Sequence, residues 1–262
     1  MKCSLIISTY NWPEALDLVL KSVLRQTTMP SEVIIADDGS KAETRLLVED
    51  YKKIFSVPLI HVWQEDIGFR LATIRNKAIS NSNFPYIIQI DGDVILNKNF
   101  IKDHLIFAKP NQYLFGSRVN IKEKKLPELF EDKNVNLNFF TSKIGKRFRA
   151  LRLPIFNLFI SKNHEVSKKL RGCNISYWKS DVLKINGYNE DFIGWGGEDY
   201  EFIHRLHLSG VVGKRIKHAA IVYHIYHKES SKENCYKNAE VQQKSFESGN
   251  FVVPNGIQKF TL

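Results

Sequence analysis

The chain has 262 residues, of which 43% are hydrophobic and 25% are charged, a composition that is ordinary for a globular domain and excludes a disordered chain. This length is enough for one large domain with a full core. No apolar run is long enough to span a bilayer, and the N-terminal residues lack the apolar region and cleavage site of a secretory signal. The three cysteines lie far apart without a Cys-x-x-Cys pair, so we expect free thiols and a cytoplasmic location.

The formal net charge of +10 is densest in residues 143–160, which begin with Lys and Arg and continue with Phe156, Leu158 and Phe159. This order suits a segment that lies at an anionic membrane surface, which would make the protein peripheral on the inner face of the plasma membrane. A solvated basic face followed by a core-facing segment is an equally good interpretation. Nucleic acid is not expected as a partner, because no nucleic-acid-binding motif accompanies the charge.

The first half of the chain alternates short apolar runs with segments of helical spacing. The apolar runs predict strands at residues 3–8, 32–36, 59–63 and 86–90. The helical segments run from Pro13 to Leu24 and over residues 44–54 and 71–80. Continuous apolar strands separated by helices indicate a Rossmann-like α/β domain, with a mostly parallel sheet covered on both faces.

The rest of the chain is predicted to complete the same domain. Residues 119–171 are charged and irregular, and we interpret them as an insertion or lid. Regular patterning returns at Cys173. With no internal repeat or linker, we expect one domain with a nucleotide-binding half at 1–118 and an acceptor-binding half at 172–262.

Two acidic clusters follow predicted strands, where ligands bind in open α/β sheets. Asp37 and Asp38 lie in "DDGS", which by itself is better explained as a local turn. Asp91 and Asp93 flank Gly92, so both carboxylates could reach a divalent cation that keeps sites open for phosphate oxygens. A diphosphate substrate is therefore predicted. There is no Walker loop or Gly-x-Gly-x-x-Gly after the first strand, which disfavours kinases and dehydrogenases.

The stretch "GWGGEDYEF", residues 194–202, places three glycines around Trp195 and directly before Glu198 and Asp199. The glycines predict a tight turn into a helix, with room for a sugar ring against the indole and two carboxylates to accept hydroxyl hydrogen bonds. A helix start with acids that complement its dipole is the simpler explanation of this motif alone.

Five segments together carry a family resemblance. They are "LIISTYNWPEALDLVLKSVLRQ", "EVIIADDGS", "GFRLATIRNKAI", "IIQIDGD" and "RGCNISYWKSDVLKINGYNEDFIGWGGEDYEF". The first four resemble the inverting glycosyltransferases of family 2, which have the GT-A fold. The last resembles the acceptor-binding half of the β-1,4-galactosyltransferases and of bacterial chondroitin-polymerase-type domains. The resemblance implies metal-dependent, inverting transfer of a hexose or N-acetylhexosamine from a UDP-sugar to a sugar hydroxyl.

The resemblance also implies roles for individual residues. Asp199 would be the catalytic base, and acceptor binding would fall to Trp195, Gly197, Glu198 and Asp199. An arginine near the diphosphate would neutralise phosphate charge, although Arg75 could equally be a structural ion-pair partner. The implied donor-binding residues are Thr9, Tyr10, Asp37, Asp38, Arg70, Asn76, Asp91 and Gly92.

The implied metal ligands are Asp91, Asp93, His224 and His227, with Asp93 favoured for direct coordination and Asp91 for bridging toward the ribose. Residues three apart on a strand face opposite sides, so both histidines can bind only if the chain turns between them. His227 is the first choice, and His224 could instead be a polar residue near the core. Mixed carboxylate and imidazole ligation suits Mn²⁺ better than Mg²⁺.

The sequence departs from the animal galactosyltransferases at Tyr200, where they carry another acid, which places it nearer the bacterial type. The basic insertion suggests a glycan or lipid-linked glycan acceptor in bacterial surface polysaccharide synthesis. Two alternatives remain at this point: a non-catalytic carbohydrate- or membrane-binding protein, and a sugar-nucleotide nucleotidyltransferase. The second would normally need a glycine- and lysine-bearing phosphate loop, which is absent.

Overall fold

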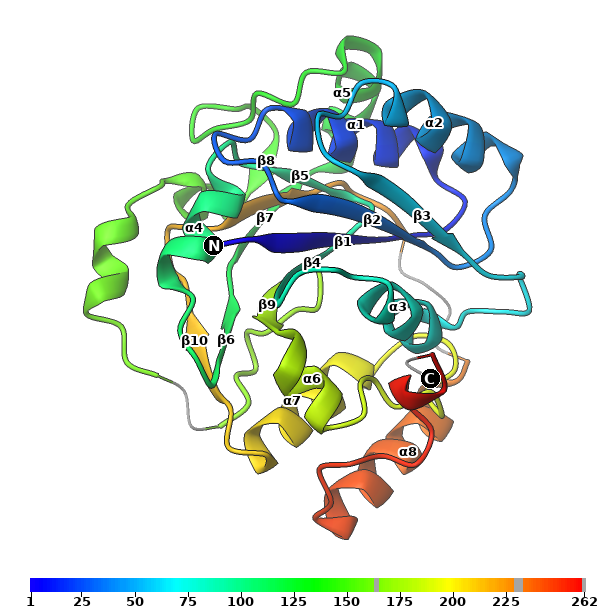
Figure 1. Ribbon diagram of the computed structural model, residues 1–262. Coiled ribbons are helices and arrows are strands. Elements are labelled where there is room, and N and C mark those ends of the chain that lie inside the picture. The colour runs from blue at the N-terminus through cyan, green and yellow to red at the C-terminus, as the bar shows by residue number, and fades with distance from the viewer. Residues whose placement is uncertain (163–164, 229–232, 261–262) are drawn as a thin grey trace.

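A seven-stranded sheet forms the centre of the computed structural model, which describes residues 1–162, 165–228 and 233–260 (Figure 1). Its strand order is β10-β6-β9-β4-β1-β2-β3, and only β9 runs antiparallel to its neighbours. The strands are β1 (Cys3–Thr9), β2 (Glu32–Asp37), β3 (Leu59–Trp63), β4 (Tyr86–Asp91), β6 (Gln112–Phe115), β9 (Asn174–Trp178) and β10 (Val212–Arg215). The prediction of a mostly parallel sheet is confirmed, with the first four strands placed to within one residue.

Helices cover both faces of this sheet, as Figure 1 shows. Successive side chains of β1 point to opposite faces, so Leu5 and Ile7 pack with α1, α2 and α4, while Ile6 packs with α3, α6 and α7. The covering helices are α1 (Pro13–Leu24), α2 (Ala42–Lys52), α3 (Leu71–Ser80), α4 (Phe100–Phe107), α6 (Lys179–Lys184) and α7 (Glu198–Leu208). The sequence predicted α1 and α3 at these bounds and α2 two residues too late.

A second, four-stranded sheet packs against α1, in the order β5-β11-β7-β8. Its strands are β5 (Val94–Leu96), β7 (Ser117–Ile121), β8 (Ile144–Gly145) and β11 (Ile221–His224). A third apolar cluster joins it to α1, where Ala15 and Leu18 contribute from the helix and Ile144 and Ala150 from the predicted insertion. The insertion is therefore tied into the core at its basic part.

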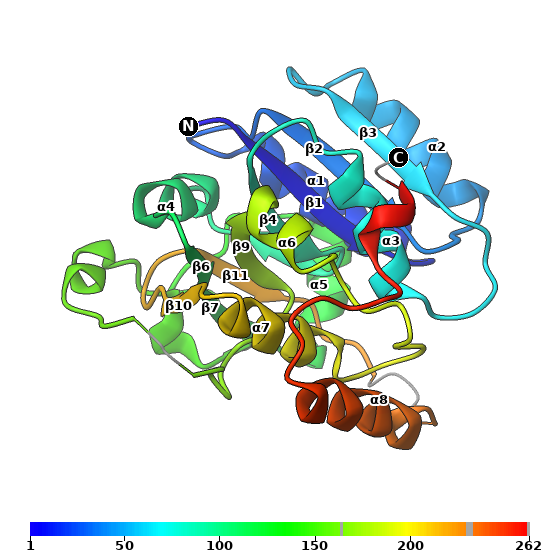
Figure 2. The same cartoon turned by 60° about the horizontal axis from the view of Figure 1, so that its bottom comes forward.

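The remaining elements are short or peripheral. The insertion contains α5 (Leu126–Asp132) and the 3-10 helices η1 (Glu123–Lys125), η2 (Arg147–Ala150) and η3 (Pro154–Leu158). The C-terminal part adds α8 (Cys235–Ser248) and η4 (Ile257–Phe260), and Figure 2 shows α8 alongside α7.

The apolar half of the insertion does not face the core. Phe156, Leu158 and Phe159 are 53%, 70% and 83% exposed, so the core-facing interpretation of these side chains is wrong. Hydrogen bonds instead hold the backbone here, because the Asn157 amide donates to Lys217 O at 2.8 Å and Leu153 N donates to His218 O at 2.7 Å. The result is an apolar patch, formed by Leu153, Ile155, Phe156, Leu158 and Phe159, that η3 presents outward.

No helix among the described residues combines the length and apolar character needed to cross a membrane.

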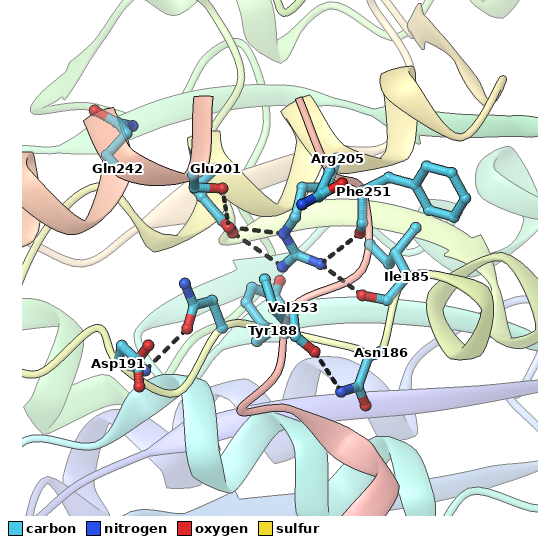
Figure 3. Close-up of polar contacts among 12 residues, drawn as sticks. Ile185, Asn186, Tyr188, Asp191, Glu201, Arg205, Gln242, Phe251 and Val253 are labelled. Atoms are coloured by element: carbon cyan, nitrogen blue, oxygen red, sulfur yellow. Dashed lines mark hydrogen bonds and ion pairs between the residues drawn. The ribbon is translucent and has the colours of Figure 1, made fainter. Parts of the chain in front are cut away.

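A buried ion pair fixes α7 to the C-terminal part of the chain (Figure 3). Arg205 and Glu201, both fully buried, are joined by bonds of 2.7 and 2.9 Å. The remaining Arg205 donors reach the carbonyls of Ile185, Gly187 and Phe251. Because a buried charge is tolerated only when its hydrogen bonds are made, this network sets the position of the helix.

We expect Arg205→Met to lower the free energy of unfolding by about 3 to 5 kcal/mol, because Glu201 would be left as an unpaired buried carboxylate. Urea denaturation followed by circular dichroism measures the effect. Arg45→Met, at an exposed position on α2, is the control and should leave the midpoint unchanged. Equal midpoints for the two variants would show that the buried pair does not hold α7.

Candidate active site

A cavity of about 960 Å³ lies where the carboxyl ends of β1 and β4 meet the start of α7 and the chain that follows β11. This is the edge at which the sequence predicted a ligand crevice. The predicted site residues that line it are Thr9, Tyr10, Asp38, Asp91, Gly92, Asp93, Trp195, Gly197, Glu198, Asp199, His224 and His227.

Three of the four predicted metal ligands gather at one point. Asp93 Oδ2 lies 3.1 Å from His227 Nε2 and 3.4 Å from His224 Nε2. His224 ends β11, and the chain leaves the strand after it, so His227 returns to the same side. Asp93 Oδ1 is buried and has no hydrogen-bond partner among the described residues. A carboxylate and two imidazoles with an unused buried oxygen fit a divalent transition metal.

The charges of the two histidines differ. The hydrogen bond that Asp93 accepts is the main reason that the pKa of His227 is raised to about 9, whereas burial lowers the pKa of His224. In this arrangement His227 holds the proton that a metal ion would displace. Asp91 stands outside the cluster, with its carboxylate turned to Arg75.

Arg75 joins the two acidic motifs across the cavity. Its side chain, only 1% exposed, places Nη1 at 2.8 Å from Asp199 Oδ1 and Nη2 at 3.1 Å from Asp91 Oδ1. Glu198 Oε1 lies 3.6 Å from Nη1, and the guanidinium also packs over the Tyr188 ring. The ion-pair interpretation of Arg75 is confirmed. Arg75 lies on the buried side of α3 together with Ala72 and Ala78.

Three carboxylates therefore share one guanidinium. Burial, reinforced by the neighbouring Asp199 charge, raises the pKa of Glu198 to about 7. Burial also raises the pKa of Asp91 to about 6 against the opposing effect of Arg75. Acids that exchange protons near neutral pH inside a cleft are typical of catalytic sites.

Glycines shape the turn that delivers the two acids of α7. Gly194, Gly196 and Gly197 have φ of 82°, 105° and 96°, the left-handed region that other residues rarely adopt. The predicted tight turn and helix start are confirmed, since α7 begins at Glu198. Trp195 is half exposed at the cavity, and Asn238 on α8 donates to its carbonyl and to that of Gly196.

Gly172 is a further requirement that the sequence pattern did not reveal. A Cβ atom at this position would lie 1.9 Å from Asp199 Oδ2, so only glycine leaves the carboxylate in place. Gly92 makes a similar approach to the end of β1, where a Cβ would meet Ser8 O and Thr9 Oγ1 at 3.0 Å.

Three predicted donor-binding residues lie outside the cavity lining. Asp37 is fully buried and engaged by His61 at 2.8 Å and by Ser40 N at 2.8 Å. Asn76, also fully buried, donates to Tyr188 O and Glu190. The Arg70 guanidinium donates to Glu65 O at 2.6 Å. Asp37 and Asn76 therefore support the site from behind, because their polar groups are bonded within the protein, whereas Arg70 Nε is buried without a hydrogen-bond partner among the described residues.

Asp38 differs from its neighbour in the same motif. It lines the cavity beside Thr9 and Tyr10, and it accepts hydrogen bonds from Gln64 Nε2 at 2.5 Å and from Arg70 N at 2.8 Å. Tyr10 is held over this region by a bond from its hydroxyl to Asp66 at 2.9 Å. Of the two acids in "DDGS", Asp37 is therefore buried behind the site and Asp38 lines the cavity.

Further cationic residues that were not singled out in the sequence also line the cavity. Arg118 comes from β7, and Lys168, Arg171 and Lys228 come from loops. Only Arg118 lies in a strand, and the loop cations carry no periodic signal.

The fold and this cavity define a GT-A glycosyltransferase. Residues 4–161 match the model of the family "Glycosyl transferase family 2", and residues 158–228 match "N-terminal domain of galactosyltransferase". The chain therefore belongs to glycosyltransferase family 2, as the resemblance implied. The comparisons support glycosyl transfer, rather than nucleotidyl transfer or binding without catalysis.

Curated relatives are similar over most of this chain. Validoxylamine A glucosyltransferase of Streptomyces hygroscopicus subsp. limoneus is 30% identical in an alignment of 223 positions that covers 79% of this chain and 48% of the relative. Chondroitin synthase of Escherichia coli is 26% identical in an alignment of 249 positions that covers 84% of this chain and 34% of that protein. The chain thus spans half or less of these relatives' lengths.

Solved structures show the same fold. Staphylococcus aureus TarS 1-349 in complex with UDP-GlcNAc matches with a TM-score of 0.62 and 18% identity, over 94% of this chain and 66% of that one. A mannosyltransferase from Pyrobaculum calidifontis, in complex with GDP-Man and Mn²⁺, matches with a TM-score of 0.58 and 15% identity, over 92% of this chain and 60% of that one.

We expect Glu198→Gln to stabilise the protein by about 1 to 3 kcal/mol at pH 8. The pKa of Glu198 is raised from 4.5 to about 7 in the folded protein, so the folded state binds more protons between these values and its stability falls as pH rises. The glutamine removes this loss, and the gain should vanish near pH 4.5.

Urea denaturation at pH 4.5, 6 and 8 measures the difference from the unmodified protein. Glu240→Gln, on the exposed face of α8, is the control and should show no pH-dependent gain. A gain for Glu198→Gln that is constant with pH would contradict the carboxylate crowding.

Proposed function

We propose that the protein transfers a hexose or N-acetylhexosamine from a UDP-sugar to a sugar hydroxyl, with inversion at the anomeric carbon and dependence on Mn²⁺ or Mg²⁺. The observation that carries the proposal is the position of Arg75, which holds Asp91 and Asp199 on two sides of one cavity. A UDP-sugar donor is supported by the TarS complexes with UDP and with UDP-GlcNAc.

The donor would lie on the β1 and β4 side of the cavity. Thr9, Tyr10 and Asp38 line that side and would contact the base and ribose, since a carboxylate accepts hydrogen bonds from N–H and hydroxyl groups. Asp93, His224 and His227 would hold the metal ion. When bound, that ion would stabilise the charge developing on the departing diphosphate.

The acceptor would lie against α7. The exposed indole of Trp195 offers an apolar face to a sugar ring, and Glu198 can accept a hydrogen bond from one of its hydroxyls. Asp199 would take the proton of the attacking hydroxyl. Its bond to Arg75 and its place in the first turn of α7 hold this carboxylate at the cavity.

We propose a glycan or lipid-linked glycan of a bacterial surface polysaccharide as the acceptor, with the apolar patch on η3 resting on an anionic bilayer at the cytoplasmic face. Its exposed aromatic and aliphatic side chains adjoin the cations of residues 143–152, which complement anionic headgroups. The similarity to chondroitin synthase supports a polysaccharide product.

Asp199→Asn should lower the rate of sugar transfer by about 100-fold or more, as expected for loss of a general base, while Mn²⁺-dependent binding of UDP is retained. Asp93→Asn should instead weaken UDP binding itself, because the diphosphate would face the acidic wall with the cation poorly held. Calorimetric titration of UDP with Mn²⁺, beside UDP release from a panel of UDP-sugars and acceptors, separates the two variants.

Glu240→Gln serves as the control for both measurements. Near-normal transfer by Asp199→Asn, or loss of UDP binding in that variant, would exclude it as the base. Metal-independent UDP binding by the unmodified protein would exclude the metal assignment.

The triple variant Phe156→Ser, Leu158→Ser, Phe159→Ser should lose co-sedimentation with phosphatidylglycerol vesicles without losing UDP binding. Substitution is preferable to deletion of this segment, because Ile144 and Ala150 belong to the core. The matched control carries serine at Leu46, Ile54 and Ile106, which are 61%, 61% and 56% exposed elsewhere. Equal sedimentation of both variants at low and high salt would exclude a membrane-binding role for the apolar patch.

A further inference from the structure

A second, smaller cavity of about 110 Å³ adjoins the cavity of the candidate active site, which we call the catalytic cavity. Seven of the nine residues that line the smaller cavity are Lys or Arg. None of the nine is acidic. Arg118 and Arg149 come from β7 and η2, and Arg215 ends β10, so regular elements position the three arginines. We refer to this feature as the cationic cavity.

The charges of the cationic cavity are not neutralised among the described residues. Its seven cations take part in no ion pair with a carboxylate of that part of the chain. Arg149 donates instead to the carbonyl of Arg118, and Arg171 to that of Lys168. Arg215 Nε is buried and has no hydrogen-bond partner in the described structure.

The cations of this cavity lie close enough to disfavour one another's charged forms. Burial, followed by the positive charges of Arg149 and Arg118, lowers the pKa of Lys146. Burial and Arg149 together lower the pKa of Arg215. A bound anion would relieve this repulsion and supply the acceptor oxygens that the Arg215 donor lacks.

The cationic cavity opens toward the acceptor side of the catalytic cavity. Arg118, Lys168 and Arg171 line both spaces. Gly172, which directly follows Arg171, packs against the Asp199 carboxylate. A ligand in the cationic cavity would therefore reach the catalytic space near the group that activates the acceptor.

We propose that the cationic cavity binds a phosphate or diphosphate group of the acceptor, an inference that rests on the proposed glycosyl transfer. A phosphate monoester carries about −1.5 to −2 charge and three acceptor oxygens, which suits several converging cations better than a single carboxylate does. Arginine forks bind phosphate oxygens in pairs and fix the orientation of the group. The acceptor would thus be a phosphate-bearing glycan, held by its anionic group while a sugar hydroxyl lies near Asp199.

The test uses inorganic pyrophosphate as the probe and protein freed of metal on a chelating resin. Calorimetric titration should show saturable binding that Arg149→Gln/Arg215→Gln weakens by at least about tenfold, a loss in the range expected for removing charge-assisted bonds. The control Arg25→Gln/Arg45→Gln removes the same charge at exposed positions and should bind as the unmodified protein does. Absence of binding, or equal weakening in both pairs, would overturn the proposal.

Competition then identifies the source of the phosphate. With Mn²⁺ restored so that UDP can saturate the donor site, pyrophosphate binding should remain, and its displacement by UDP would assign the cationic cavity to the donor and overturn the proposal. Displacement by phosphatidylglycerol vesicles would assign it to a lipid headgroup, with the same consequence. Arg149→Gln alone should weaken binding and Arg149→Lys should restore part of it, which separates charge from misfolding. Mn²⁺-dependent UDP binding by the same variants tests the proposed function independently.

Discussion

The bond network of the buried Arg75 guanidinium holds the two halves of the candidate site together. Asp91 ends β4 in the first half and Asp199 lies in the first turn of α7 in the second, and both bind this one cation. With the guanidinium withdrawn from water, its desolvation is compensated only while these carboxylates stay in place. The same constraint crowds Glu198 against Asp199, so the geometry of the site is maintained against electrostatic strain.

Such a strained arrangement needs rigid support on the side of α7. The ion pair of Glu201 and Arg205 supplies it one turn further along the helix, where both charges are fully buried and bonded. The glycine turn before Glu198 and the space left by Gly172 then determine where the acids point. Support on the β2 side comes from Asp37, which binds His61 and the turn behind Asp38. Groups that are already held in position do not have to move when charge develops in the transition state, which avoids an energetic cost during the reaction.

Opposite charges are divided between the walls of the catalytic cavity. The acids come from the ends of β2 and β4 and from the start of α7, whereas the cations other than Arg75 come from β7, the insertion and the chain after β11. In a cleft of low dielectric constant, each of these charges interacts more strongly with a bound ligand. This suits the two substrates proposed here, because the donor carries phosphate charge and the acceptor hydroxyl gives up a proton. The apolar patch on η3 and the cationic cavity both belong to this basic region, so the positive charge is concentrated where we propose contact with the acceptor and the membrane.

The order of strands and helices was readable from the sequence, because apolar runs and helical spacing are local properties, and β1 to β4 and α3 lie where these patterns predicted. The acids of the site were found from the family resemblance and from their positions, since Asp38, Asp91 and Asp93 lie at or after strand ends and Glu198 and Asp199 follow the glycine turn. The pairing of Arg75 with Asp91 and Asp199, the outward direction of Phe156 and Phe159, and the burial of Asp37 and Asn76 away from the cavity could not be read in this way. Each depends on which distant segments pack together, and contacts between residues more than 100 positions apart, such as Arg75 with Asp199, leave no periodic trace in one sequence.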